Sequence, residues 1–267
     1  MYLIDPDNWR WLWNGNNLRF LVEGFLVNLE IAVLCMALSL IFGLLLALGR
    51  ISRNGLIRRP VGAWIDVWRN LPLIFVILYL ALALPASWRR AYEQSVPDFL
   101  PEAFQSGRVL GAILGLTLYN SAVIAEIMRA GIQSLERGQG DAALALGMTR
   151  WQSMRRVILP QGLRRMVPAT VSQLITLNKD TTLVSIIAIQ EVMRHARIVT
   201  GFNFFGGVQA PPLQVFLVVG AMFIAVNLLL SRLSRRLEIR ERRRTGITVE
   251  QVTGLEDQVA ARADVAA

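Results

Sequence analysis

The sequence predicts an all-α, polytopic membrane protein with five transmembrane helices. Apolar residues make up 54% of the 267 residues, which is more than a soluble domain with a solvated surface tolerates. Five apolar runs are each close to the roughly 20 residues that a helix needs to cross the bilayer core. The alternating pattern typical of a membrane β-barrel does not occur in the sequence.

The apolar runs cover residues 25–48, 61–84, 109–130, 167–189 and 213–233. Each is expected to be a helix because every backbone amide in lipid must be hydrogen-bonded within its own segment. Gly107, Gly111 and Gly115 open the third run, and small residues at this spacing let two helices approach closely. Pro72 in the second run and Pro168 in the fourth fit tolerated kinks or first-turn prolines.

These runs divide the chain into three parts. Residues 1–24 form an extracytoplasmic or interfacial segment, in which Trp9, Trp11 and Trp13 are expected near the membrane interface. Residues 25–237 form the transmembrane domain and include a cytoplasmic loop at 133–166, and residues 238–267 form a cytoplasmic tail. The domain boundaries follow directly from the apolar pattern.

The distribution of arginine predicts the orientation in a bacterial plasma (inner) membrane, since cytoplasmic loops carry an excess of basic residues. The richer set of arginines follows the first, third and fifth runs, and comprises Arg50, Arg53, Arg58, Arg59, Arg137, Arg150, Arg155, Arg156, Arg164, Arg165, Arg232, Arg235, Arg236, Arg240, Arg242, Arg243 and Arg244. The amino terminus is therefore expected outside and the carboxyl terminus in the cytoplasm.

Composition argues against several classes of function. The net charge is +9, but the charged residues lie between apolar runs and form no nucleic-acid-binding motif. Membrane lipid is therefore an expected partner and nucleic acid is not. Cys35 and His195 are the only cysteine and histidine, too few for an ordinary Cys/His zinc site or a Cys-His dyad. No metal, no catalytic residue and no cofactor bound by this chain are expected.

The longest charged connection contains the segment 138–147, GQGDAALALG. Asp141 fits the start of a short helix, the following alanines and leucines favour helix, and Gly147 fits its left-handed end. Thr149 is a candidate cap for a second, amphipathic helix that is expected to end at Pro160. Small side chains suit close contact with another protein, although this spacing equally fits a loop that has no partner.

Polar residues interrupt the fourth run near its middle, where an ionised side chain exposed to lipid costs about 2.5 to 3.5 kcal/mol. Lys179 and Asp180 must therefore meet polar groups, either a substrate or neighbouring side chains that they neutralise. Glu126 and Arg129 lie one helical turn apart and can pair, which favours a structural or gating role for both. The candidate pathway residues are Asn178, Lys179, Asp180, Thr181, Thr182, Asn120, Glu126 and Arg129.

The connection also resembles the EAA loop of permease subunits in bacterial ATP-binding-cassette (ABC) importers of polar amino acids. The resemblance rests on residues 138–147 and on 157–161, VILPQ, at the matching spacing. Residues 68–73, 125–132 and 178–183 support it in order along the chain. Asp141 stands where the family usually has Glu, and Gly162 where Ala is usual.

The resemblance implies a permease that is not itself an enzyme. Family members pair two permease subunits, identical or related, with two ATPase subunits and receive substrate from an extracytoplasmic binding protein. ATP and Mg would be bound by the partner ATPase, which agrees with the missing glycine-rich loop before Lys179, the only lysine. Residues implied in coupling to the ATPase are Gly138, Gln139, Asp141, Ala142, Ala143, Leu146 and Gly147.

The transported amino acid is less closely defined. Residues 147–154, GMTRWQSM, resemble permeases for glutamate and aspartate, which favours an acidic substrate, although this segment belongs to the loop and does not touch substrate. A secondary transporter or channel that works without ATP is the alternative. Such proteins usually carry more spans and internal repeats, and have no need of an alanine-rich cytoplasmic loop.

Overall fold

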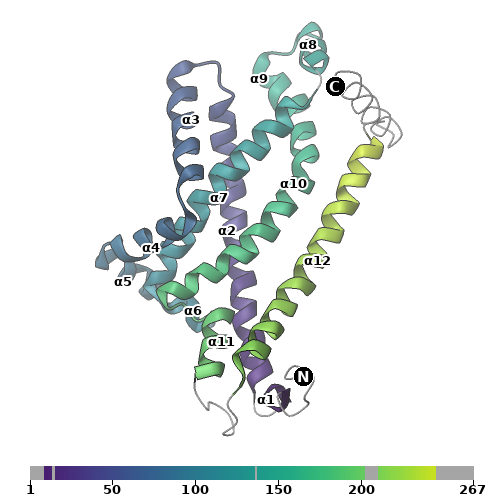
Figure 1. Cartoon of the computed structure of the whole chain (residues 1–267). Helices are drawn as coiled ribbons and strands as arrows, with labels where there is room; N and C mark the ends of the chain where they lie inside the picture. The colour runs from purple at the N-terminus through teal and green to yellow at the C-terminus, as the bar shows by residue number, and fades with distance from the viewer. Residues whose placement is uncertain (1–8, 14–15, 136, 202–209, 245–267) are drawn as a thin grey trace, which may run out of the picture.

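The computed structural model describes residues 9–13, 16–135, 137–201 and 210–244, and every regular element within these ranges is helical (Figure 1). Four long helices run lengthwise through the molecule: α2 (Asn17–Arg50), α7 (Gly107–Gln133), α10 (Leu159–Asp180) and α12 (Pro212–Arg244). The predicted all-α membrane fold is confirmed.

The main core lies between α2 and α7, where Ile31, Leu116 and Ile124 are fully buried. A second cluster joins the first turns of α2 and α12 to α11 (Val192–Gly201) and to the short α1 (Arg10–Trp13). Trp11 is buried in this second cluster, whereas Trp13 is exposed and remains free to lie at the membrane interface. Trp9 is half-buried.

Three described helices are long and apolar enough to cross a membrane by themselves: α2, α7 and the stretch Pro212–Glu241 of α12. α10 has the length of a span, but Arg164, Arg165, Lys179 and Asp180 lower its mean hydropathy. The first, third and fifth predicted spans are therefore supported, while the total of five remains a prediction.

The second predicted span is not one continuous helix. It consists of α3 (Gly55–Asn70) and α4 (Leu73–Ala83), which meet at an angle of 100°. Pro72 caps α4, and Leu71 before it has an extended backbone with ψ of 138°. A residue that precedes proline avoids the helical region, which explains why α3 ends there. The expectation of a single helix over residues 61–84 is wrong.

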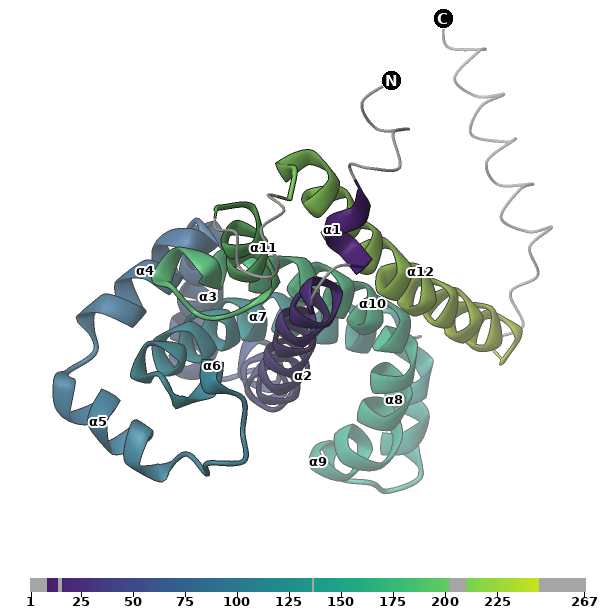
Figure 2. The ribbon, with the colours of Figure 1, turned by 90° about the horizontal axis from the view of Figure 1, so that it is seen from below.

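α4 packs against α7, as the glycine spacing predicted. A Cβ atom on Gly111 would lie 2.4 Å from the Cα atom of Ala81, so only glycine allows this approach. α5 (Ala86–Ser95) and α6 (Glu102–Gln105) follow α4 and lead into α7. Figure 2 shows α5 projecting away from the other helices.

The charged connection forms α8 (Arg137–Ala145) and α9 (Arg150–Ser153), and a π-helical turn, Met154–Ile158, joins α9 to α10. Both project at one end of the molecule (Figure 1). The predicted cap is confirmed, since Thr149 and Gln152 form a capping box. Two local expectations are wrong: α8 begins at Arg137 and not at Asp141, and Pro160 lies in the first turn of α10 and does not end a helix.

Candidate functional site

α8 presents an exposed surface of small and apolar side chains. Ala142, Ala145 and Leu146 are exposed, Leu146 to 80%, whereas Ala143 is buried at 4%. Gly138, Gln139 and Asp141 are exposed too. Gly147 ends the segment with φ of +79°, a conformation that side chains other than glycine rarely adopt. A surface of this kind allows close approach by the backbone of another protein.

Hydrogen bonds fix α8 and the end of α7 to α10. Gln161 donates from Nε2 to Oε1 of Gln139 at 2.8 Å. Arg165 donates from its guanidinium to the Ser134 carbonyl oxygen at 2.7 Å, at the end of α7. These two bonds connect α8 and the end of α7 to α10.

A cavity of about 500 Å³ lies between α4, α7 and α10. Asp180 contributes its only charged side chain, and Thr176 and Gln173 line the same wall one and two turns earlier on α10. Gln173 donates from Nε2 to Oδ1 of the fully buried Asn120 at 2.9 Å, which ties α10 to α7. Tyr119 lines the opposite side of the cavity.

The polar residues next to Asp180 point in other directions. Asn178 is buried and donates to Asn227 Oδ1 on α12 at 3.2 Å. Thr181 is buried against α2, where its hydroxyl oxygen accepts a hydrogen bond from the Asn28 side chain. Thr182 donates to the Lys179 carbonyl, and the Lys179 side chain itself is exposed on the outside of this chain. Successive residues of a helix point about 100° apart, so the predicted polar strip does not share one surface.

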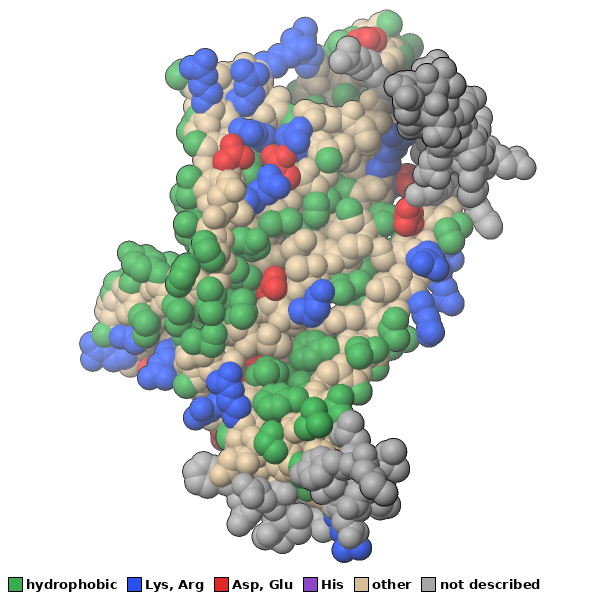
Figure 3. Space-filling view, viewed as in Figure 1, with side chains coloured by type: hydrophobic (Ala, Val, Ile, Leu, Met, Phe, Trp, Pro, Cys, Tyr) green, Lys and Arg blue, Asp and Glu red, His purple; other side chains and the backbone are tan. Residues whose placement is uncertain are grey.

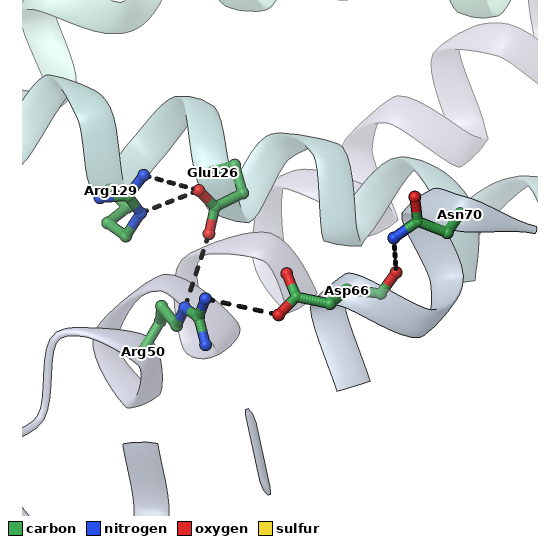
Figure 4. A network of polar contacts seen from close by, with 5 residues as sticks. All are labelled: Arg50, Asp66, Asn70, Glu126 and Arg129. Carbon is green, nitrogen blue, oxygen red and sulfur yellow. Dashed lines mark hydrogen bonds and ion pairs between the residues drawn. The ribbon is translucent and has the colours of Figure 1, made fainter. Parts of the chain in front are cut away.

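Glu126 and Arg129 belong to a separate charge cluster (Figure 4). Arg129 binds the Glu126 carboxylate through two nitrogens, both at 2.8 Å, and also contacts Gln133. Arg50 at the end of α2 lies 3.8 Å from Glu126 and 3.5 Å from Asp66 on α3. The cluster joins α2, α3 and α7, and neither Glu126 nor Arg129 lines the cavity. Their pairing agrees with the structural or gating role expected of them.

Sequence reasoning missed several residues at these places. Gln173, Thr176 and Asp180 share one side of α10 at spacings of three and four, so helical periodicity could have identified the first two. Tyr119 precedes the predicted Asn120 and carried no separate signal. No sequence signal linked Arg50 to Glu126, since their contact depends on how distant helices pack.

Comparison with known proteins identifies the fold and its family. Residues 39–243 match the family model described as binding-protein-dependent transport system inner membrane component. The chain belongs to this family. The match includes α8 and α10, the two helices that the Gln139–Gln161 hydrogen bond joins.

Two relatives named as amino acid permeases support the predicted membership in the amino acid branch of ABC permeases. The chain is 35% identical over 229 residues to the probable glutamine ABC transporter permease protein GlnP of Bacillus subtilis, covering 86% of this chain and 97% of that protein. It is 34% identical over 224 residues to the glutamate/aspartate import permease protein GltK of Escherichia coli O157:H7, covering 82% and 94%.

Solved structures lead to the same family. An amino acid ABC transporter crystallised with histidines matches with a TM-score of 0.68 and 27% identity, covering 84% of this chain and 94% of that chain. The inward-facing methionine ABC transporter MetNI matches with a TM-score of 0.61 at 20% identity, covering 82% and 97%, and supports the fold alone.

Gly162 lies at a close approach of α7 and α10. A Cβ atom there would lie 3.0 Å from a side-chain carbon of Ile132 and 3.1 Å from its Cα atom on α7. Gly131 faces it, and a Cβ on Gly131 would lie 2.9 Å from the Gly162 carbonyl oxygen. α7 and α10 therefore approach each other closely here, beside the α8 connection.

Proposed function

We propose that this chain is the membrane-spanning permease subunit of an ATP-driven importer that takes up a polar amino acid. The observation that carries the proposal is α8, an exposed helix of small residues, ended by Gly147 and hydrogen-bonded to the helix that lines the cavity. A separate ATPase subunit binds this surface, and ATP and Mg stay on that partner. The permease binds no cofactor of its own.

Coupling then follows from the contacts of α8. Gly138, Gln139, Asp141, Ala142, Leu146 and Gly147 form the side that meets the ATPase, while the buried Ala143 packs toward the permease. When the ATPase closes on nucleotide, α8 moves with it. The Gln139–Gln161 hydrogen bond passes that movement to α10 and so to the wall of the cavity.

The substrate pathway runs past the cavity that Asp180 and Gln173 line. The Asp180 carboxylate accepts hydrogen bonds from the substrate ammonium group, and the Asn120–Gln173 pair supplies neutral hydrogen-bonding groups beside it. Lys179 is exposed although it lies within the fourth apolar run. A lysine facing lipid is unfavourable, which supports a polar neighbour there: the second permease subunit, identical or related, or the water-filled pathway between the two.

The remaining partners and the topology complete the proposal. An extracytoplasmic binding protein delivers the substrate, the amino terminus lies outside, and the carboxyl terminus lies in the cytoplasm of a bacterial cell with the chain in its inner membrane. Residues 25–237 are the permease domain, flanked by segments 1–24 and 238–267. Glutamate or aspartate is the favoured substrate, and glutamine comes next because the Bacillus subtilis relative is named for it.

The coupling assignment is tested by Ala142→Trp. Ala142 is exposed on α8 and has an ordinary helical backbone, so tryptophan blocks docking without the backbone strain that any substitution of Gly147 introduces. We expect the purified variant to fold normally but to lose the co-purifying ATPase and ATP-dependent uptake. Ala91→Trp, at an exposed alanine of α5, is the matched control and should retain both.

Substrate identity is tested by competition for uptake into vesicles that contain the intact transporter. Unlabelled glutamate, aspartate, glutamine and arginine compete with a radiolabelled acidic amino acid, and we expect glutamate and aspartate to compete best. Uptake by the purified chain alone, without ATP or ATPase, would contradict the proposal and favour a secondary transporter.

A further inference from the structure

A basic patch lies at the start of α3 and in the loop just before it. It consists of Arg53, Arg58 and Arg59, hereafter the α3 arginine patch, and all three side chains are exposed. None of the three makes an ion pair or a side-chain hydrogen bond to any residue that the structure describes. Residues 31–65 contain no aspartate or glutamate, so this stretch has no acid of its own to neutralise them.

Apolar side chains border the α3 arginine patch on the same helix. Leu56 is 86% exposed and Ile57 46%, and Trp64 and Val67 are exposed further along α3. Figure 3 shows basic side chains gathered over this end of the molecule, with apolar side chains following below them. A helix that combines exposed arginines at its start with an exposed apolar side suits the boundary between lipid headgroups and acyl chains.

The backbone adds to the positive charge. α3 is 16 residues long and has no acidic residue in its first turn, so its N-terminal amide groups carry the positive end of the helix dipole. The nearest acid along the chain, Asp66, faces Arg50. By contrast, the arginines at the end of α12 alternate with Glu238 and Glu241.

We propose that the α3 arginine patch binds the headgroup of an anionic phospholipid, with Leu56 and Ile57 against its acyl chains. Charge complementarity defines the occupant, because the surface offers only donors and positive charge to a phosphate group and an apolar surface directly beside it. The lipid fixes the start of α3 against the bilayer. This role is independent of the transported substrate and of the ATPase.

The experiment compares phosphatidylglycerol with phosphatidylcholine. The purified full chain in neutral detergent is titrated with each lipid, and bound lipids are counted by native mass spectrometry. We expect wild type to prefer phosphatidylglycerol. Arg58→Gln/Arg59→Gln should weaken its binding about 30-fold, since each arginine near a lipid surface contributes about 1 kcal/mol. Arg90→Gln/Arg108→Gln removes two exposed arginines elsewhere and should leave binding unchanged.

Three outcomes would overturn the proposal. They are equal binding of the two lipids by wild type, equal loss in both double variants, and full retention of phosphatidylglycerol by Arg58→Gln/Arg59→Gln. The Arg58→Gln/Arg59→Gln variant could instead keep its phosphatidylglycerol binding and, when purified without lipid, lose the co-purifying ATPase. That result would assign the surface to the ATPase. If that variant unfolds, Arg53→Gln, in the loop before α3, replaces it and should weaken phosphatidylglycerol binding about fivefold.

Discussion

Two polar clusters join α2 to other helices, one toward the α8 end of the molecule and one toward the α11 end. Near α8, Arg50 reaches Asp66 and Glu126 through partly exposed ion pairs of 3.5 and 3.8 Å. Near α11, Asn28 and Glu191 are fully buried and joined at 3.0 Å.

The two clusters differ in what it takes to open them. Partly exposed ion pairs exchange with water and contribute little each, whereas a buried hydrogen-bond network leaves unsatisfied groups when it opens. Asn28 donates to Thr181 and Glu191 and accepts from the Val192 backbone amide, so α2, the end of α10 and α11 are fixed together. We infer that the α11 end is the rigid frame and that the α8 end rearranges during transport.

The largest effect is expected from Asn28→Leu. The substitution preserves the approximate shape but leaves the Val192 N–H and the Glu191 carboxylate without this partner. We expect a loss of about 3 kcal/mol in the free energy of unfolding, measured by SDS titration in mixed micelles. Asn227→Leu is the control, because it removes the hydrogen bond that Asn227 accepts from Asn178 at 3.2 Å, and it should lose about 1 kcal/mol. Equal losses would show that the Asn28 network is no stronger than a single hydrogen bond between two helices.

Glu126→Gln should have an intermediate effect. The carboxylate binds Arg129 through two nitrogens at 2.8 Å and is shielded, with a side-chain exposure of 17%. We expect a loss of about 1 to 2 kcal/mol, because the carboxylate oxygen that accepts from two Arg129 nitrogens is replaced by an uncharged amide. The loss should shrink in 1 M salt. A loss that is unchanged by salt would mean that packing, and not charge, holds α7 at this point.

Gly62→Ala offers a smaller perturbation of the same cluster. A Cβ atom at Gly62 would lie 1.5 Å from a guanidinium nitrogen of Arg50, so the flexible Arg50 side chain must move away from its carboxylate partners. We expect a loss below about 1 kcal/mol. The effect should be non-additive with Arg50→Gln, since both changes remove the same contacts. Additive losses would show that Gly62 serves some other purpose.

Arg19→Gln should have no measurable effect on unfolding. Arg19 and Glu23 pair at 2.8 Å near the start of α2, but their side chains are 75% and 51% exposed. This pair tests whether burial, and not position at the α11 end, gives the Asn28 network its strength. A clear loss on substituting Arg19 would argue that position is what matters.

Local signals allowed much of the fold to be predicted. The apolar runs, the Thr149 cap, the left-handed Gly147 and the close approach at Gly111 all depend on neighbouring residues or on one helix surface. The 100° angle at Pro72 was not predictable, because proline explains why α3 ends but the direction of α4 depends on its packing against α7.

The candidate site was predicted only in part. A polar residue within an apolar run suggested a pathway position for Asp180, and Asp180 does line a cavity. Its neighbours Lys179, Asn178 and Thr181 point in other directions. The Asn28–Glu191 pair is separated by 163 residues and left no periodic trace in the sequence. A contact between residues so far apart in the sequence can be identified only once the structure is known.

The break between α3 and α4 also affects how mechanical load travels through the protein. A straight rod transmits axial thrust from end to end, but two rods meeting at 100° convert such a push into rotation at their joint. A load on α3 would therefore not continue along α4 but would reach α7 at the close contact between Ala81 and Gly111.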